Sequence, residues 1–234
     1  MANDITKLLS GNAYPGRGLM MGLAPDGQRL VTLYFIMGRS ENSRNRVFYQ
    51  ENGLLRIGFH DLRLVKDASL ISYHPMARVD QALILTNGDQ TDTIADALHE
   101  GGSFESALRT RSFEPDAPLF TPRISGLANI ETGAYQLSIL KSGDAEGRSC
   151  QRFFFDYEPL PGLGHLIHTY QQDGNPPPSY QGEPASVNIP ADLSGFAEQV
   201  WQSLDSNNRV ALCLLEQALS GGSPKLTIFN RHTV

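Results

Sequence analysis

The apolar residues of this chain fall mainly into short runs that are separated by turn residues. The run within 29–38 is apolar on both faces, which predicts a strand that is covered on both sides. It follows the turn Ala24-Pro25-Asp26-Gly27-Gln28, in which proline presets φ and glycine tolerates positive φ, so 17–24 and 29–38 are predicted to form a hairpin. Further strands are predicted at 47–49, 54–58, 62–65, 69–73, 82–86, 123–130, 134–141, 150–157, 163–171, 209–215 and 225–230.

Helical periodicity is confined to a few segments. Residues 91–100 show one apolar face, and either Asp89 or Thr91 is placed to act as the N-cap. A pair of glycines ends this segment, and Ser103 then caps a second short helix that is predicted to run through Arg109. The amphipathic segment 193–204 predicts a third helix.

Two proline-containing segments, 113–122 and 173–190, are predicted to be loops, the second one long and on the surface. Strands outnumber helices, and hairpins outnumber β-α-β units, which predicts an α+β fold with mostly antiparallel sheets. Since no repeat or change of composition marks a boundary, we expect residues 1–234 to form a single domain.

Composition narrows the class of function. The chain is 40% hydrophobic and 19% charged, as is typical of globular proteins, and its net charge of -6 disfavours binding to nucleic acid. Its two cysteines, Cys150 and Cys213, have neither zinc-site spacing nor the number needed for a disulfide framework, so both are predicted to be buried packing residues. The first residues do not resemble a signal peptide, and no apolar run reaches the roughly 20 residues of a membrane span, so we expect a cytoplasmic protein.

The strongest candidate for a binding site follows the buried strand directly. It is the segment Gly38-Arg39-Ser40-Glu41-Asn42-Ser43-Arg44-Asn45-Arg46. Arginine offers a planar fork of donors that suits phosphate, and a loop at the end of a buried strand can present such groups to a pocket. The alternative is a solvated polar turn, against which stand the absence of lysine and the abrupt change from apolar to polar residues.

Three other polar segments could contribute chemistry. Residues 14–18 place an arginine in a glycine-flanked turn, and residues 86–93 run from a strand end into a helix start. The carboxylates of Asp89 and Asp92 would repel phosphate, so this second segment suits ribose or base instead. Residues 113–124 hold carboxylates and an arginine in a proline-stiffened loop, where a carboxyl could serve as acid or base. Each segment also has a purely structural alternative: a tight strand entry, a helix cap or a surface loop.

Taken in order, four stretches resemble the archaeal-type IMP cyclohydrolases. They are Tyr14-Pro15-Gly16-Arg17-Gly18, Gly38-Arg39-Ser40 to Asn45-Arg46, Thr86-Asn87-Gly88 to Thr91-Asp92, and Phe120-Thr121-Pro122-Arg123-Ile124. The resemblance implies an Ntn-hydrolase-like fold, a four-layer αββα sandwich of mostly antiparallel sheets. It also implies a hydrolase-class enzyme of purine biosynthesis, which closes the ring of formylated AICAR ribotide (FAICAR) to give IMP with loss of water and needs no cofactor.

The resemblance further implies roles for individual residues. Tyr73 and Glu114 match the tyrosine and glutamate that the family is proposed to use for proton transfer. Arg39 would clamp the phosphate or polarise the formyl oxygen. Arg44 and Arg46 would share this role, with Arg17 and Arg123 in reserve. Asn45, Asn87 and Asp92 would hold the base or the ribose.

Two other functions remain open at this point. One is a non-catalytic or regulatory protein that binds purine ribonucleotides. The other is an Ntn-type amide hydrolase, which would need processing to expose an N-terminal nucleophile, because Met1 is followed by Ala2-Asn3-Asp4. The expected partner is a small purine ribonucleotide (FAICAR, AICAR or IMP), not nucleic acid or a membrane, and self-association into a homo-oligomer is compatible with the sequence.

Overall fold

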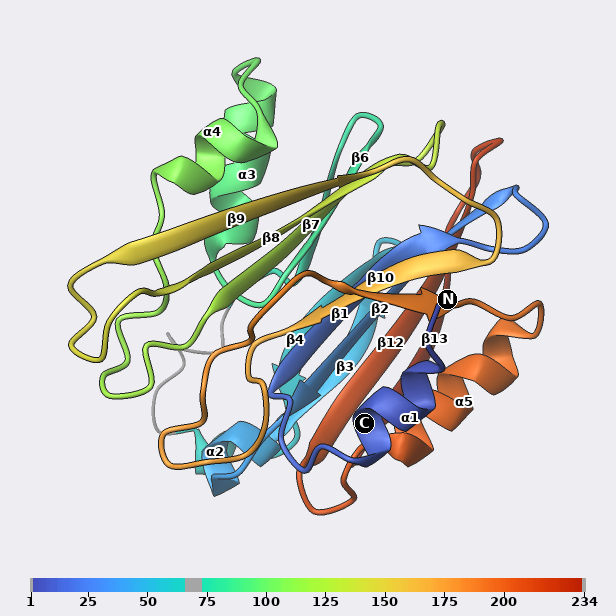
Figure 1. The fold of residues 1–234 in the computed structure, drawn as a ribbon. Helices are drawn as coiled ribbons and strands as arrows, with labels where there is room; N and C mark the ends of the chain where they lie inside the picture. The colour runs from blue at the N-terminus through green and yellow to red at the C-terminus, as the bar shows by residue number, and fades with distance from the viewer. Residues whose placement is uncertain (1, 66–72, 233–234) are drawn as a thin grey trace.

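The computed structural model describes residues 2–65 and 73–232, and two antiparallel sheets dominate it (Figure 1). The first sheet comprises β1 (Arg17–Leu23), β2 (Arg29–Met37), β10 (Leu163–His168), β11 (Ala185–Asn188), β12 (Arg209–Ala218) and β13 (Lys225–Asn230). Its strands lie in the order β11-β10-β1-β2-β12-β13, and each is antiparallel to its neighbours. The predicted hairpin of 17–24 and 29–38 is therefore confirmed as β1 and β2.

The second sheet follows the chain order β5-β6-β7-β8-β9, again with antiparallel pairing throughout. Its strands are β5 (Met76–Val79), β6 (Ala82–Thr86), β7 (Arg123–Asn129), β8 (Tyr135–Ser142) and β9 (Cys150–Tyr157). A separate hairpin, β3 (Arg46–Glu51) with β4 (Leu54–Phe59), lies beside β13 and is tied to it by Asn230, whose Oδ1 accepts the Phe48 N–H at 2.8 Å.

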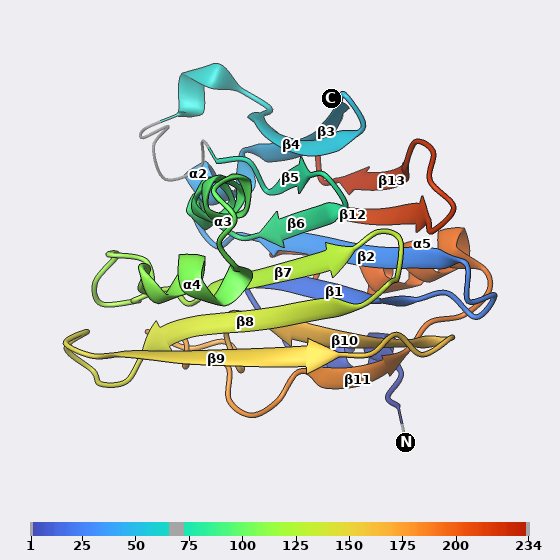
Figure 2. The same cartoon turned by 90° about the horizontal axis from the view of Figure 1, so that it is seen from above.

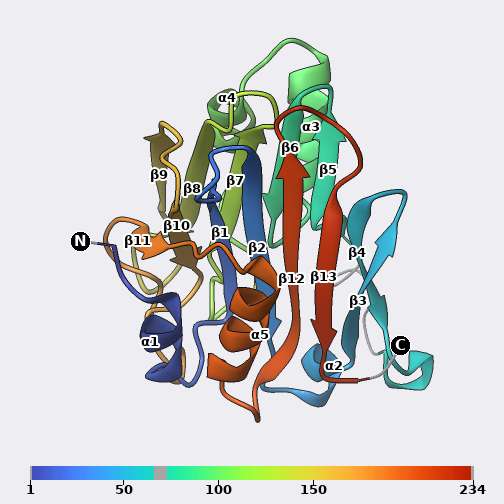
Figure 3. The same cartoon turned by 90° about the vertical axis from the view of Figure 1, so that its right-hand side faces the viewer.

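Helices cover the outer face of each sheet, as Figures 2 and 3 show. α1 (Ile5–Ser10) and α5 (Leu193–Ser203) pack on the first sheet, and α3 (Gln90–His99) and α4 (Phe104–Arg109) pack on the second. Along β2, Leu33 and Phe35 face the helices, whereas Tyr34 and Ile36 face the other sheet. This strand is thus covered on both sides, as its continuous apolar run predicts, and the layers run helix, sheet, sheet, helix.

The α+β class with mostly antiparallel sheets is confirmed, and some local predictions are wrong. The strand predicted at 62–65 is instead a 3-10 helix, η1 (Leu62–Leu64), because the Asp61 carboxylate accepts the Arg63 N–H at 2.9 Å and closes a turn. The 173–190 segment is not all loop, since β11 pairs with β10. Most of the strand predicted at 69–73 lies outside the described residues.

Cys213 is buried between the sheets as predicted, whereas Cys150 is only half-buried at the start of β9. Among the residues that the structure describes, none of the helices combines the length and the apolar character of a membrane span.

Candidate functional site

A cavity of about 420 Å³ opens where strand ends from both sheets meet. β1 and β7 begin there, β6 ends there, and β3 leaves it. Because neighbouring strands are antiparallel, the start of one lies beside the end of the next, which brings residues far apart in sequence to one rim. The cavity is lined by Arg17, Ser40, Asn42, Ser43, Arg46, Tyr73, Asn87, Gly88, Asp89, Glu114, Pro115, Asp116 and Arg123.

One wall of the cavity is the turn after β2, which contains the short helix α2 (Glu41–Arg44). Ser40 is its N-cap: Ser40 Oγ accepts the Ser43 N–H at 3.1 Å, and Ser43 Oγ accepts the Ser40 N–H at 3.1 Å. A Cβ on Gly38 would lie 2.5 Å from Ser43 Oγ and 2.9 Å from the Ser43 carbonyl carbon. Glycine at position 38 therefore allows the capped turn to fold back against the end of β2.

Arg17 and Arg46 form a cationic side of the cavity. Arg46 is only 1% exposed; its Nε donates to the Ser43 carbonyl at 2.9 Å and its Nη2 to the Met37 carbonyl at 3.3 Å. Arg46 Nη1, Arg17 Nε and Asn42 Oδ1 are buried without a hydrogen-bond partner in the described part of the chain. Burial lowers the pKa of Arg46, and the charge of Arg17 lowers it further.

These two arginines lack a carboxylate partner among residues 2–65 and 73–232. Two neighbouring cations, of which Arg46 is buried and Arg17 is partly buried, are costly unless a negative charge compensates them. A bound anion would supply that charge and would also satisfy the unpartnered donors. The cationic side therefore suits a phosphate group.

Arg123, Asp89 and Glu114 form the ion-paired side of the cavity. Arg123 is 5% exposed, and its Nη2 donates to Glu114 Oε2 at 3.0 Å while its Nη1 lies 3.0 Å from Glu114 Oε1. The same Nη1 donates to Gln90 Oε1 at 2.6 Å and pairs with Asp89. Burial raises the pKa of Glu114, against the opposing charges of Arg123 and Arg17. A buried carboxyl with a raised pKa is typical of groups that transfer protons.

Tyr73 also lines the cavity, and its hydroxyl lies 2.8 Å from that of Tyr34. Tyr34 belongs to β2 and is 1% exposed, and burial raises its pKa well above the ordinary value. Tyr34 is therefore a neutral phenol that fixes the position of the Tyr73 hydroxyl.

The structure brings together most of the residues predicted from the sequence to form the site, namely Arg17, Arg46, Tyr73, Asn87, Glu114 and Arg123. Asn87 has a structural role in this wall. Its Nδ2 donates to the Pro122 carbonyl at 2.9 Å, and its Oδ1 accepts the Ile124 N–H at 2.9 Å and Gln90 Nε2 at 3.0 Å. The amide oxygen and one amide N–H therefore help to join β6 to β7 at the cavity.

The remaining predicted residues do not line the cavity. Arg39 Nη1 donates to Asp173 Oδ1 at 2.9 Å and to the Gly174 carbonyl at 2.7 Å, and its guanidinium lies 4.6 Å from the centre of the Tyr14 ring. Arg44 donates to the Gly38 carbonyl at 2.9 Å and to Asn208 Oδ1 at 3.1 Å. Both arginines therefore join loops at the rim of the cavity by hydrogen bonds.

Asn45 and Asp92 lie outside the cavity as well. Asn45 is buried, and its amide both donates to the Asp61 carbonyl at 2.7 Å and accepts the Asp61 N–H at 2.8 Å. Asp92 is exposed, with Oδ1 at 3.2 Å from His74 Nδ1. Asn45 therefore joins two loops, and Asp92 contacts His74 and is not among the residues that line the cavity.

Ser40, Asn42 and Ser43 belong to the predicted binding segment 38–46 without an individual predicted role, and they line the cavity together with Asp89. The first three lie between the predicted arginines, and their N-cap pattern could have indicated that this turn is folded and not solvated. Asp89 was considered only as a helix cap or as a carboxylate near ribose. No sequence signal distinguishes it from Asp92.

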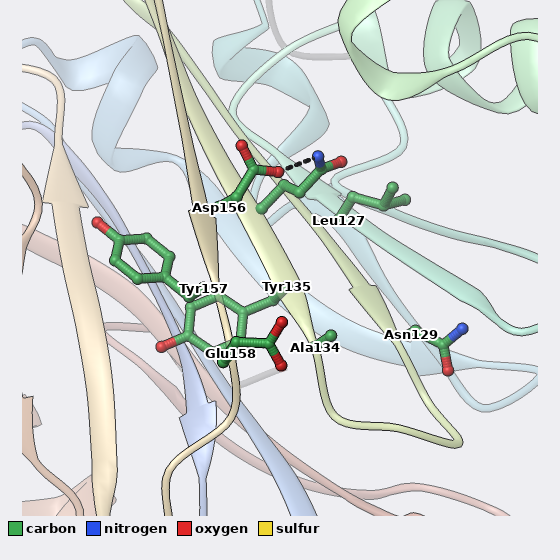
Figure 4. Close-up of a pocket in the computed structure, with 8 residues that line it drawn as sticks. Leu127, Asn129, Ala134, Tyr135, Asp156, Tyr157 and Glu158 are labelled. Carbon is green, nitrogen blue, oxygen red and sulfur yellow. Dashed lines mark hydrogen bonds between the residues drawn. The ribbon is translucent and has the colours of Figure 1, made fainter.

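A second cavity lies at the other end of β7, and Figure 4 shows its lining. The Gln136 side chain bonds to Asp156 there, beside the rings of Tyr135 and Tyr157. As far as the structure describes it, this lining includes Asp156 and Glu158 but neither lysine nor arginine. It therefore offers no cation to a phosphate. Within the described ranges, no three histidine, cysteine, aspartate or glutamate side chains come together as a metal site requires.

Comparison with known proteins identifies the family. A family described as "IMP cyclohydrolase-like protein" matches residues 14–220, a range that includes every residue lining the first cavity. The chain is 30% identical over 160 residues to the IMP cyclohydrolase of Methanopyrus kandleri, which covers 67% of this chain and 75% of that protein. It is also 30% identical over 127 residues to the IMP cyclohydrolase of Methanosphaera stadtmanae, which covers 52% of this chain and 61% of that protein. The chain therefore belongs to the IMP cyclohydrolase-like protein family.

Proposed function

We propose that this chain is an IMP cyclohydrolase, which closes the purine ring of FAICAR to give IMP and releases water. Its family and the names of its relatives support this activity. The observation that carries the proposal is the composition of one cavity. Its lining holds buried guanidinium atoms that have no partner in the described part of the chain, together with a partly buried carboxyl whose pKa is raised.

The cationic side would hold the substrate phosphate. Arg17 and Arg46 would supply charge and donors, and the hydroxyls of Ser40 and Ser43 lie in the same lining. Asn42 would accept a hydrogen bond from a ligand donor, because its Oδ1 is an acceptor with no partner in the described part of the chain. The cavity volume of about 420 Å³ is within the range of small-molecule sites.

With the phosphate fixed, the reacting groups would lie toward Glu114 and Tyr73. The carboxamide nitrogen forms a bond to the formyl carbon and gives up one proton. The formamido nitrogen gives up a second proton as its double bond to the formyl carbon forms, and the formyl oxygen leaves with both protons as water. Glu114 would accept a proton from the nitrogen, and Tyr73 would donate one to the oxygen. Positioning alone is worth up to roughly 7–11 kcal/mol in favourable intramolecular reactions, so the phosphate clamp contributes to rate as well as to binding.

The finer assignments belong to the same proposal. The helix-sheet-sheet-helix order supports an Ntn-hydrolase-like sandwich, and we propose that residues 1–234 act as one domain. The proposed partner is a small purine ribonucleotide. A cytoplasmic location remains a prediction from the sequence.

A turnover assay tests the proposal. Purified protein is given FAICAR, and IMP formation is followed by ultraviolet absorbance, with Glu114→Gln as the matched variant. We expect turnover by the unmodified chain and a strong loss in the variant. Folded protein that binds IMP in calorimetry but does not turn over FAICAR would refute the enzymatic proposal and indicate a non-catalytic nucleotide-binding protein.

A further inference from the structure

Two arginines and two carboxylates form a continuous chain of ion pairs beside the cavity. Both carboxylate oxygens of Asp89 accept hydrogen bonds of 2.6 Å from Arg111 Nη2, and Asp89 also pairs with Arg123. Arg123 in turn makes two contacts of 3.0 Å with the Glu114 carboxylate. The order is therefore Arg111, Asp89, Arg123, Glu114, and Arg123 is shared between the two carboxylates.

The described contacts show no other structural role for the Asp89 side chain. It occupies the N-cap position of α3, yet its side chain makes no capping hydrogen bond to the helix. A carboxylate at this position ordinarily accepts an N–H of the first helical turn. Here it faces the two arginines instead.

Glycine at position 88 leaves room for the pairing of Arg123 with Glu114. A Cβ at position 88 would lie 2.7 Å from Arg123 Nη1 and 2.7 Å from Glu114 Oε1, closer than unbonded atoms can approach. The backbone of the turn therefore passes directly against the Arg123 and Glu114 pair, and the next residue, Asp89, pairs with the same Nη1 atom of Arg123 that contacts Glu114.

We propose that Asp89, whose charge is divided between Arg111 and Arg123, is a positioning residue that shares the Arg123 guanidinium with Glu114 and so keeps the Glu114 carboxyl available for proton transfer. This proposal rests on the proposed cyclohydrolase activity only for proton transfer by Glu114. The sharing of Arg123 between Asp89 and Glu114 is present in the free protein. An Arg123 paired with Glu114 alone would hold that carboxylate ionised, because two-point arginine pairs are strong.

The charges that surround Glu114 support this role. Arg123 faces it from β7 and Arg17 from β1, whereas Asp89 faces it from the turn before α3 and Asp116 from its own loop. The cavity also holds Arg46 from β3 and the phenol of Tyr73. Burial and the two acidic neighbours raise the pKa of Glu114, and the two arginines oppose the rise.

Asp89 itself stays ionised. Burial works against its charge, but the hydrogen bond from Arg111 and the charges of Arg123 and Arg111 hold the pKa of Asp89 below its ordinary value. Asp89 is therefore negative, and it divides its charge between Arg111 and Arg123.

Two variants that are expected to shift the Glu114 titration midpoint in opposite directions give the sharpest test. The side-chain carboxyl of Glu114 is titrated by NMR in protein with 13C-labelled glutamate, and Glu114→Gln identifies its resonance. Asp89→Asn removes the competing carboxylate, so we expect the Glu114 titration midpoint to fall by on the order of one pH unit. Arg111→Gln removes a positive charge and leaves Asp89 free to draw Arg123 away, so we expect the midpoint to rise.

The same opposite shifts are expected in the limb of the kcat/KM pH profile that reports Glu114. Asp92→Asn, on an exposed carboxylate of the same helix start, should leave both midpoints unchanged, and Arg111→Lys should restore most of the unmodified behaviour. If one variant fails to fold, the other still predicts a shift of fixed sign.

Shifts in the same direction, or no shift, would overturn the proposal, because a purely structural role lowers activity without moving the Glu114 midpoint in opposite directions. An unmodified protein that lacks turnover but shows the opposite NMR shifts would refute the proposed function and retain the sharing of Arg123. Turnover of FAICAR without those NMR shifts would retain the proposed function and refute the sharing of Arg123.

Discussion

On one side of the cavity, Arg17 and Arg46 keep buried nitrogen atoms without partners in the described part of the chain. On the other side, Arg123 lies between the carboxylates of Asp89 and Glu114. Both sides contain arginine at strand ends, with Arg46 and Arg123 buried and Arg17 partly buried, and they differ in whether the protein itself supplies the negative charge.

That difference assigns substrate binding to the cationic side of the cavity and proton transfer to the ion-paired side. A buried cation without a counter-charge is most stable when an anionic ligand arrives, so Arg17 and Arg46 suit the substrate phosphate. A buried cation that already has two carboxylates gains little from a further anion. It governs instead how readily one of those carboxylates, Glu114, changes its proton state.

The largest effect is expected from the ion-paired side. Glu114→Gln keeps the size of the side chain and removes its capacity to accept a proton, so kcat should fall by about 10²–10⁴-fold with little change in IMP affinity. Steady-state kinetics and calorimetry measure the two quantities. Glu105→Gln, on the exposed face of α4, serves as the control and should behave as the unmodified chain. A loss of IMP affinity equal to the loss of kcat would show that Glu114 binds and does not react.

On the cationic side, Arg17→Met should reduce kcat/KM by roughly 10–150-fold, because hydrogen bonds to charged groups are worth about 1.5–3 kcal/mol. The free variant should nevertheless unfold at a higher temperature, since the substitution removes one of two neighbouring buried charges.

Arg39→Met is the matched control, because Arg39 lies outside the cavity lining. It should leave kcat/KM within a few-fold of the unmodified value. An equal loss in both variants would contradict the assignment of the phosphate to Arg17 and Arg46.

The smallest effect concerns inorganic phosphate as a probe of the unpartnered donors. At about ten times its dissociation constant it should stabilise the free protein by ~1.4 kcal/mol, which is a rise of roughly 3–6 °C in melting temperature. Arg17→Met should lose most of this rise, and Asp89→Asn should keep it. Differential scanning calorimetry measures the shift, and an undiminished rise in Arg17→Met would place the anion elsewhere.

Much of the framework could be predicted from the sequence, because strands and amphipathic helices leave periodic patterns. The continuous apolar run of β2 and the proline-glycine turn before it predict a buried hairpin, which is what forms. β11 was missed because its residues, Ala185–Asn188, follow a proline-rich stretch and pair only with the distant β10. Such pairing depends on tertiary context that local pattern does not contain.

The site was predictable in outline and not in detail. Arg44 and Arg46 belong to the same polar segment, yet the turn of α2 places only Arg46 in the cavity lining. Asp89 and Asp92 are three residues apart, and only Asp89 meets Arg111 and Arg123. Residue type identified the right segments, whereas the direction of each side chain depends on short turns whose geometry a single sequence does not specify.

A crystal structure with IMP bound tests the two-sided cavity most directly. We predict that the phosphate contacts the guanidinium groups of Arg17 and Arg46, and that the purine ring lies toward Glu114 and Tyr73. A phosphate held by Arg39 or Arg44 at the rim, or a nucleotide bound in the cavity beside Tyr135 and Tyr157, would contradict this account.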